Sequence, residues 1–324
     1  MSHTFVFEKE AILCRHTLDG WQPFALPLAA ELTSEQPRYQ LGRVELLESL
    51  APSYWQQDDK DCAISQAQLS SAPATSAISY DYARLHQLTL PKITASADLQ
   101  TIVETALESE SDKVAPIYAF ISYRKLVTQL APALADQLSQ AIQLLRWQAD
   151  TRFCSRCSAP VAAAETGERA MVCSVCRLRQ YPRVQPCIIT AITRPNPQTG
   201  EMQVLLAHHH RYGQTSLPLQ YGLIAGFVEV GESLEHAVVR EVYEEVNIHL
   251  TDIRYVSSQP WPFPSNLMLG FRADYASGEI VWQEDELSHA DFFDLSDLPK
   301  IPFKGSIAYE LIAQIAEEQG VELC

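Results

Sequence analysis

The chain has 324 residues, 47% hydrophobic and 20% charged, which is enough apolar material for two or three domains with buried cores. This composition excludes a disordered tail and a disulfide-stabilised miniprotein. The sequence contains 40 acidic and 24 basic residues, so the formal charge is −16, and the chain as a whole repels phosphate backbones at long range. Nonspecific nucleic-acid binding by a basic face is therefore not expected.

Membrane and export signals are not expected either. No run approaches the roughly 18 to 20 apolar residues that a membrane helix needs, and the first residues lack a basic segment followed by an apolar one. Of the 8 cysteines, four form two Cys-x-x-Cys pairs and four are scattered, which suits a reducing compartment better than a disulfide framework. We expect a cytoplasmic protein with no membrane partner.

Residues 1–149 are expected to form an N-terminal α+β domain, because short apolar runs alternate with prolines. A polar, Ser- and Ala-rich stretch from Asp58 to Ser79 predicts a long loop or insertion. From Ala133 to Ala149 there is no Pro or Gly, and apolar residues recur at helical spacing. An amphipathic helix is therefore predicted to end this domain, with a boundary near residue 150.

Two cysteine pairs follow, and their spacing is typical of a zinc ribbon over residues 150–183. Fifteen residues separate the pairs, as in sites where four thiolates surround zinc; the ligands would be Cys154, Cys157, Cys173 and Cys176. The chain between the pairs predicts a hairpin over Val161–Val172. Catalytic zinc or a nucleic-acid-binding ribbon are the alternatives. Four thiolates leave no position for an activated water, and the chain is acidic, so structural Zn2+ is favoured.

The remaining residues, 184–324, begin with two predicted strands. Pro186–Ile192 and Gln203–Ala207 are apolar runs on either side of a turn at Pro195–Gly200. The three histidines 208–210 cannot converge on one ion from a strand, where neighbours point to opposite faces, so a polar loop is expected there. Cys187 lies in the first apolar run and is interpreted as a small buried hydrophobe rather than a nucleophile.

A predicted helix then carries a patch of carboxylates. The run Ser233–Val246 contains no breaker, and four apolar residues recur every fourth position as a buried stripe: Leu234, Val238, Val242 and Val246. Residues three and four apart are neighbours on a helix surface, so Glu241, Glu244 and Glu245 share one patch. Hard divalent cations would compensate their repulsion. A solvated acidic face is the alternative interpretation.

The segment from Gly226 reads Gly-x5-Glu-x7-Arg-Glu-Val-x-Glu-Glu, which resembles the box of the Nudix hydrolases. One position departs from that pattern, because Asn247 stands where the family has a late Gly. That position follows the helix end, where left-handed geometry is expected, and Asn tolerates it best after Gly. The resemblance implies a Nudix α/β/α sandwich around a mixed sheet and metal-assisted hydrolysis of a nucleoside diphosphate linked to another moiety.

The same resemblance implies roles for individual residues. The metal ligands for Mg2+ or Mn2+ would be Glu241, Glu244, Glu245 and the carbonyl of Ala225. Glu232 and Arg240 would form an ion pair that holds the loop against the helix and orients the ligands, and they count among the catalytic residues. Either Glu245 or Glu241 would deprotonate the attacking water.

Beyond the box, the string Ser258–Asn266 contains three alternating prolines and two aromatic residues. Prolines fix φ, so a stiff loop presenting aromatic rings for stacking is expected, with ordinary core packing as the alternative. The string resembles the Ser-Gln-Pro-Trp-Pro-Phe-Pro-x-Ser marker of the NADH pyrophosphatase (NudC-like) branch, with Asn266 in place of the last Ser. Its substrate-binding residues would be Gln259, Pro260, Trp261, Pro262, Phe263, Pro264, Ser265 and Asn266.

Five more residues receive roles from this resemblance. Tyr181 would stack on a substrate ring, within one subunit or across a dimer interface, with Phe227 opposite. Glu286 would complete the metal site, and Glu168 and Ala308 occupy positions that touch substrate in the family. For Tyr181 and Glu286 the alternatives are an ordinary half-buried tyrosine and a surface glutamate.

The resulting prediction is a homodimeric diphosphatase that splits NADH or NAD+ into AMP and nicotinamide mononucleotide, with Mg2+ or Mn2+ as the catalytic metal. Two alternatives stay open at this point. One is removal of NAD caps from RNA 5′ ends by the same cleavage. The other is a binding module in which the zinc ribbon docks protein or nucleic acid and the Nudix domain is only a scaffold.

Overall fold

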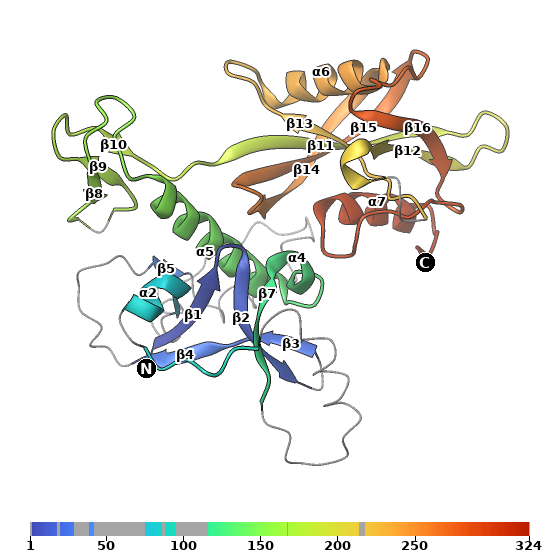
Figure 1. The fold of residues 1–324 in the computed structure, drawn as a ribbon. Helices are drawn as coiled ribbons and strands as arrows, with labels where there is room; N and C mark the ends of the chain where they lie inside the picture. Colours follow the sequence, from blue (N-terminus) through green and yellow to red (C-terminus); the bar gives the residue numbers. More distant parts are fainter. Residues whose placement is uncertain are drawn as a thin grey trace, which may run out of the picture. The chain divides into compact units, whose positions relative to one another are not determined.

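The chain is organised as two units, Met1–Arg183 and Val184–Cys324 (Figure 1). The computed structural model describes residues 2–17, 20–28, 39–41, 75–85, 88–94, 116–166, 168–213 and 218–323. Within these residues, no helix has the length and apolar character needed to span a bilayer. The division of the first unit into an α+β domain and a ribbon remains a prediction.

The first unit is built on a seven-stranded sheet in which β3, β2, β1, β6 and β5 are neighbours in that order, while β4 pairs with β1 and β7 with β2. The strands are β1 (Ser2–Glu8), β2 (Ala11–Thr17), β3 (Gly20–Pro23), β4 (Ala25–Leu28), β5 (Tyr39–Leu41), β6 (Thr75–Ser79) and β7 (Tyr118–Ser122). The helices are α2 (Tyr80–Leu85), α4 (Tyr123–Leu126) and α5 (Pro132–Asp150). Val6, Leu13 and Ile78 form the centre of its core.

The helix predicted before the cysteines is confirmed as α5, whereas the loop predicted over Asp58–Ser79 is wrong at its end. Thr75–Ser79 form β6, which pairs in parallel with β1. Ala77 and Ile78 are buried there, so two apolar side chains and β-compatible Ser and Thr outweigh the polar character of the stretch. Residues 58–74 lie outside the described residues.

A small three-stranded antiparallel sheet carries the cysteines. Its strands are β8 (Val161–Ala163), β9 (Met171–Cys173) and β10 (Arg179–Gln180), and β8 and β9 form the predicted hairpin. Met171 packs with Leu144 and Trp147 of α5 in one buried cluster. The ribbon therefore rests on the last turns of α5.

The second unit is a six-stranded mixed sheet with a helix on each face. Its elements are β11 (Gln185–Pro195), β12 (Met202–His209), η3 (His210–Tyr212), β13 (Ile224–Phe227), α6 (Leu234–Val246), β14 (His249–Trp261), β15 (Asn266–Ser277), β16 (Leu287–Asp294) and α7 (Ile307–Glu318). The order is β14-β15-β11-β12-β16, with β13 on β11. Only the β11–β15 pair is parallel among the described strands of this sheet. The two predicted strands around a turn are confirmed as β11 and β12.

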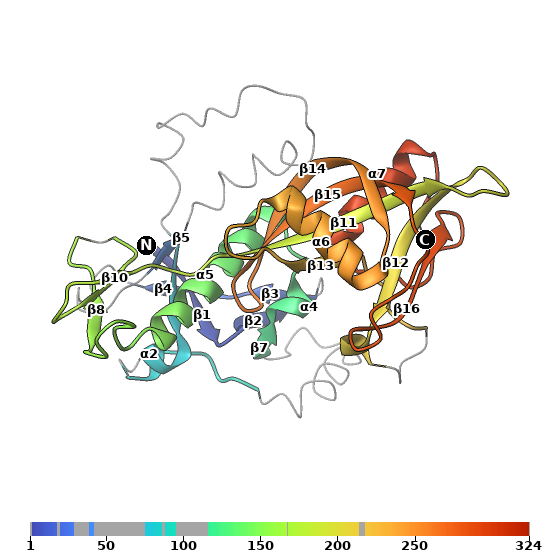
Figure 2. The same cartoon turned by 90° about the horizontal axis from the view of Figure 1, so that it is seen from above.

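The helices α6 and α7 cover opposite faces of this sheet, as Figures 1 and 2 show. Along β11, Ile188 and Ile192 pack on the α6 side, whereas Ile189 and Ala191 pack on the α7 side. A central strand covered on both faces is rich in apolar residues on both sides, which explains why the run Cys187–Ile192 is apolar at every position except the buried Thr190. The predicted α/β/α architecture with a mixed sheet is confirmed.

One local expectation in this unit needs correction. The proline-rich string is not a loop throughout, because Ser258–Trp261 form the end of β14. β14 is an edge strand, and Pro260 is tolerated at an edge because only one side of the strand needs ladder hydrogen bonds. The loop begins after Trp261.

Candidate functional site

The helix α6 begins and ends where its sequence predicts. The Ser233 side chain accepts a hydrogen bond from the His236 backbone N–H (3.2 Å), which caps the first turn. Asn247 ends the helix in the left-handed conformation, with φ 58° and ψ 33°. Val238, Val242 and Val246 are fully buried, so the glutamates beside this stripe have a fixed direction.

The carboxylate of Glu241 lies directly against the backbone of Gly226 in β13. A Cβ at residue 226 would overlap the Glu241 carboxylate, so no residue with a side chain fits there without moving it. β13 is itself held by antiparallel pairing to β11, with Cys187 opposite Phe227. The first glycine of the box is therefore required by close approach rather than by a turn.

Arg240 connects the loop to the helix through five hydrogen bonds. Its Nε and Nη2 bind the two oxygens of Glu232 at 2.8 and 2.9 Å, and Nη2 also donates to the Phe227 carbonyl (2.9 Å). Nη1 donates to Glu241 (2.9 Å) and to Glu244 (2.9 Å). The guanidinium thus orders two box carboxylates while it fastens the preceding loop.

The box glutamates differ in the direction of their pKa shifts: the pKa of Glu232 is lowered, whereas those of Glu241 and Glu245 are raised. Hydrogen bonds from Arg240, with one from the Glu229 N–H, lower the pKa of the Glu232 carboxyl to about 2. Burial raises the pKa of Glu241, against the opposing effect of Arg240. Burial also raises the pKa of Glu245 to about 8, and the neighbouring Glu241 and Glu286 add to that rise. Strongly shifted carboxyls in one place are typical of a functional site.

Glu245 is almost fully enclosed, with 2% of its surface exposed. Its Oε2 has no hydrogen-bond donor within the described part of the chain. The His209 ring lies beside it, with Nε2 3.9 Å from Glu245 Oε2. Burial lowers the pKa of His209 to about 3, so the ring is neutral at neutral pH and does not compensate the carboxylate.

The polar loop expected for the three histidines is wrong for two of them. His208 and His209 end β12 and are buried, and only His210 begins the short helix η3. As expected for neighbours in a strand, the two side chains point to opposite faces of the sheet. His208 Nδ1 contacts the Gln220 carbonyl (2.7 Å), whereas the His209 ring lies beside Glu245. His209 was missed as a site residue because tertiary burial by α6 decides its environment.

Two further charged residues act on the same carboxylates from outside the helix. Glu286 contributes to the raised pKa of both Glu241 and Glu245, and it stands next to a loop whose Gln283 N–H donates to the Glu245 carbonyl (2.9 Å). Arg211, in η3, opposes the rise at Glu245. Glu286, whose role as a metal ligand stays a prediction, and Arg211, for which the sequence held no motif signal, are therefore close enough to act on these carboxylates.

The glutamates suit a hard divalent cation. Carboxylate oxygens are the ligands that Mg2+ and Mn2+ prefer, and the buried Glu245 oxygen, which has no hydrogen-bond partner in the described ranges, is the type of atom that a cation would satisfy. Two of these carboxylates, Glu241 and Glu244, are bound by Arg240. A cation would compete with Arg240 for these oxygens. The Ala225 carbonyl belongs to β13, immediately before Gly226.

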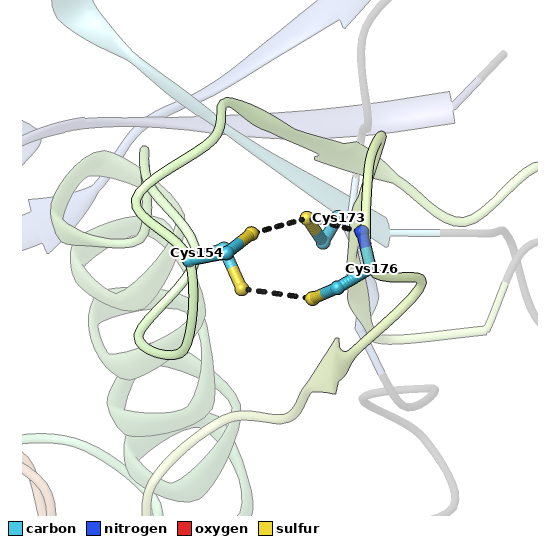
Figure 3. Close-up of side chains that lie close together, drawn as sticks. Cys154, Cys173 and Cys176 are labelled. Atoms are coloured by element: carbon cyan, nitrogen blue, oxygen red, sulfur yellow. Dashed lines mark hydrogen bonds between the residues drawn. The ribbon is translucent and has the colours of Figure 1, made fainter.

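The cysteines are the group of metal-binding side chains already gathered in the described residues: their sulfur atoms all lie within 4.8 Å of one another. Figure 3 shows Cys154, Cys173 and Cys176 directed towards a common centre. The Cys154–Cys176 and Cys157–Cys173 sulfur distances are 3.5 and 3.4 Å, too long for disulfides and close to the ~3.8 Å edge of a zinc tetrathiolate. Backbone N–H groups of Arg156, Val175 and Cys176 donate to the sulfurs, as thiolates require. The cluster can hold a metal ion.

The aromatic-proline string runs from the end of β14 to the first residue of β15, and it contacts the segment that leads into α7. Trp261 is half-buried, stacked on Phe303 with ring centroids 6.2 Å apart. The side-chain amide of Gln259 donates to the Gly305 carbonyl (2.8 Å) and accepts from the Ile307 N–H (2.9 Å). Gln259 therefore secures the first turn of α7, and its amide is already occupied.

The other members of the string differ in exposure. Pro262 is buried, Phe263 is half-buried against Trp261, and Pro264 is exposed. Ser265 donates to Gln185 Oε1 (3.0 Å), and Asn266 Oδ1 is buried without a hydrogen-bond partner among the described residues.

Four more predicted substrate residues lie in different environments. Tyr181 and Phe227 are exposed aromatic rings, with 53% and 49% of their surfaces accessible. The Tyr181 hydroxyl donates to Glu168 (3.0 Å), which also pairs with Arg179. Ala308 is buried in the core cluster under α7, so its side chain presents no free surface.

Comparisons with known proteins assign the class and then the family. The NUDIX domain model matches residues 187–315. The chain is 44% identical over 205 residues to the NAD-capped RNA hydrolase NudC of Klebsiella pneumoniae subsp. pneumoniae, an alignment that covers 63% of this chain and 72% of that relative. The protein is a Nudix hydrolase and belongs to the NudC family.

Two further matches were found. A relative of the same name from Pseudomonas aeruginosa strain PAO1 is 46% identical over 175 residues, covering 54% of this chain and 59% of the relative. Among solved structures, a NUDIX hydrolase from Nitrosomonas europaea matches with a TM-score of 0.42 and 22% identity, covering 52% of this chain and 92% of that chain.

Proposed function

We propose that the protein is a divalent-cation-dependent NAD(H) diphosphatase that hydrolyses the pyrophosphate bond of NADH or NAD+ to AMP and nicotinamide mononucleotide. The observation that carries this proposal is the buried carboxylate of Glu245, without a partner among the described residues, beside Glu241, Glu244 and Glu286. A site of this kind binds a cation that in turn binds an anionic bridge. The names of the relatives direct the proposal to a nicotinamide dinucleotide.

In the proposed reaction, water adds to one phosphorus of the bridge and the oxygen between the two phosphates leaves with the other nucleotide. A bound Mg2+ or Mn2+ would neutralise the pyrophosphate and lower the pKa of the attacking water. Glu245 or Glu241 accepts the proton of that water, since both carboxyls have raised pKa values. Arg240 keeps Glu241 in place, and Glu232 holds Arg240.

Recognition of the nucleoside parts is assigned to aromatic and polar residues of both units. Phe227 and Tyr181 are exposed rings suited to stacking on planar bases, whereas Trp261 and Phe263 already pack on each other. Glu168 and Ala308 remain weaker assignments. We also propose Zn2+ for the four cysteines, a homodimer and a cytoplasmic location.

Removal of NAD caps from RNA is the second candidate, because the relatives are named NAD-capped RNA hydrolases. It uses the same bond cleavage with an RNA chain attached to the adenosine side. A pure binding module is the less favoured alternative, since the box carboxylates and their arginine are all present and ordered.

The test is product analysis after incubation of the protein with NADH and Mn2+. The wild type is expected to release AMP and reduced nicotinamide mononucleotide in equal amounts, and Glu245→Gln to lose at least about 100-fold in kcat. Glu235→Gln is the matched control, because this exposed carboxylate lies in the first turn of the same helix. No AMP from the wild type, or equal AMP from wild type and Glu245→Gln, contradicts the proposal.

A further inference from the structure

The basic residues of the chain are concentrated in the ribbon. Residues 150–183 contain six of the 24 Lys and Arg residues, all of them arginines, against Asp150, Glu165 and Glu168. This segment has a formal balance of +3 in a chain of −16. A zinc tetrathiolate would contribute −2, and the ribbon would still be net positive. Its local charge is therefore opposite to that of the whole chain.

All six arginine side chains are exposed: Arg152, Arg156, Arg169, Arg177, Arg179 and Arg183. Arg179 pairs with Glu168. Arg152, Arg156, Arg177 and Arg183 have no ion pair within the described ranges of the chain. Exposed cations without carboxylate partners are available to an anionic ligand.

Two of these arginines stand on the two turns that meet at the metal site. Arg156 lies between Cys154 and Cys157, and its backbone N–H donates to Cys154 Sγ (3.4 Å). Arg177 follows Cys176 directly, in a left-handed conformation with φ 60°. Because the four sulfurs lie within 4.8 Å of one another, the two turns that carry Arg156 and Arg177 are held next to each other, and both arginines are exposed.

Exposed apolar side chains accompany the arginines at that end. Phe153, next to Cys154, is 64% exposed, and Val175, between Cys173 and Cys176, is 71% exposed. β10 joins this end as well, because the Ser155 N–H donates to Gln180 Oε1 (2.8 Å) and Gln180 Nε2 donates to the Phe153 carbonyl (3.3 Å). Cations interleaved with an exposed aromatic ring are typical of surfaces that bind single-stranded nucleic acid.

A simpler explanation is that the arginines only balance the charge of the thiolates. The hydrogen bonds to the sulfurs argue against it, since their donors are the backbone N–H groups of Arg156, Val175 and Cys176. The guanidinium groups are directed to solvent, with both residues exposed. A ligand with repeated negative charges accounts for them better.

We propose that the metal-binding end of the ribbon, defined by Phe153, Arg156, Val175 and Arg177, binds the single-stranded RNA body of an NAD-capped transcript. The proposal rests on the proposed cleavage of a nicotinamide dinucleotide and adds where the attached RNA chain is held. Arg156 and Arg177 contact phosphates, and Phe153 stacks on a base. Free NADH has no such chain, so this surface does not affect its hydrolysis.

The test compares RNA binding with NADH hydrolysis in the full-length, zinc-bound protein. The probe is an uncapped, 3′-labelled single-stranded RNA of about ten nucleotides, titrated by fluorescence anisotropy at several salt concentrations. For Arg156→Gln/Arg177→Gln, the slope of log K against log salt is expected to fall by roughly 0.7 for each phosphate that the variant no longer binds. Phe153→Ser is expected to weaken binding about tenfold.

The control is Arg84→Gln/Arg254→Gln, which removes the same charge from exposed positions outside the ribbon and is expected to bind RNA with the wild-type slope. kcat/KM of the ribbon variants is expected to fall for NAD-capped RNA and to stay unchanged for NADH. The proposal is overturned if wild type and ribbon variants give equal salt slopes. It is also overturned if the arginine variant loses zinc, or if this end of the ribbon is buried in a dimer and the protein does not bind RNA. Arginine-dependent RNA binding by a protein that does not cleave NADH contradicts only the proposed function.

Discussion

The Glu241 carboxylate occupies the space that a side chain on Gly226 would need. This contact joins β13 to α6 at the point where the predicted ligand set begins. It means that the position of Glu241, the proposed metal ligand, depends on the absence of a Cβ at residue 226. The box pattern Gly-x5-Glu-x7-Arg-Glu therefore encodes one packing contact as well as an ion pair.

Gly226→Ala is expected to displace Glu241 and to lower hydrolysis about 10- to 100-fold, the usual range when a metal ligand loses its support. Activity should be measured as a function of Mn2+, because a weaker site requires more metal. Gly270→Ala is the matched control in the same sheet. Its Cβ meets the flexible end of Ile307 at 2.9 Å, so it affects packing under α7 and not the carboxylates. Equal Mn2+ dependence of Gly226→Ala and wild type contradicts this role.

Arg240→Lys is expected to lower kcat about 10- to 100-fold while the protein stays folded. A lysine keeps the charge but cannot bind both oxygens of Glu232 and the Phe227 carbonyl at once. Arg272→Lys serves as the control, because Arg272 makes a similar forked pair with Glu318 away from the site. If both variants lose activity to the same extent, the effect is one of general stability.

Acid should remove the contribution of the Glu232–Arg240 pair to stability. The pKa of Glu232 is lowered from 4.5 to about 2 in the folded chain, so its contribution is present above pH 4.5 and is lost as the pH falls towards 2. The free energy of unfolding should be measured by denaturant titration for wild type and Glu232→Gln across this range. The difference between them is expected to shrink on acidification, and a pH-independent difference contradicts the pairing.

Cys173→Ala is expected to lose the metal of the ribbon, because three remaining thiolates bind zinc more weakly by orders of magnitude. Zinc content by mass spectrometry and protease sensitivity of the 150–183 segment report the change. Cys187→Ala is the control, since this buried cysteine lies in β11 outside the cluster, and burial raises the pKa of its thiol to about 11. Zinc retained by Cys173→Ala would place the metal elsewhere.

Local patterns allowed most of the second unit to be predicted from the sequence. The apolar stripe, the Ser233 cap and the left-handed Asn247 define α6 within the chain itself, and the mainly apolar run of β11 marks a central strand. These features depend on neighbours in the sequence. They could be inferred before any tertiary contact was known.

The errors arise where distant segments decide the structure. His209 is buried because α6 covers the end of β12, and nothing beside it in the sequence indicates this. The sequence did not indicate that Gln259 bonds to the first turn of α7 more than forty residues further along the chain, while its predicted contact with substrate stays a prediction. Thr75–Ser79 became a strand through pairing with β1. The net charge of the whole chain also gave no sign that residues 150–183 are locally basic, because the acidic residues elsewhere outweigh their arginines.

The central claim is that the box glutamates hold a divalent cation, and anomalous diffraction from crystals soaked in Mn2+ tests it most directly. The account expects a manganese peak within about 2.2 Å of carboxylate oxygens of Glu241 and Glu245, with the zinc edge giving a separate peak among the four cysteines as an internal control. A zinc peak in the ribbon with no manganese at these glutamates would contradict the account.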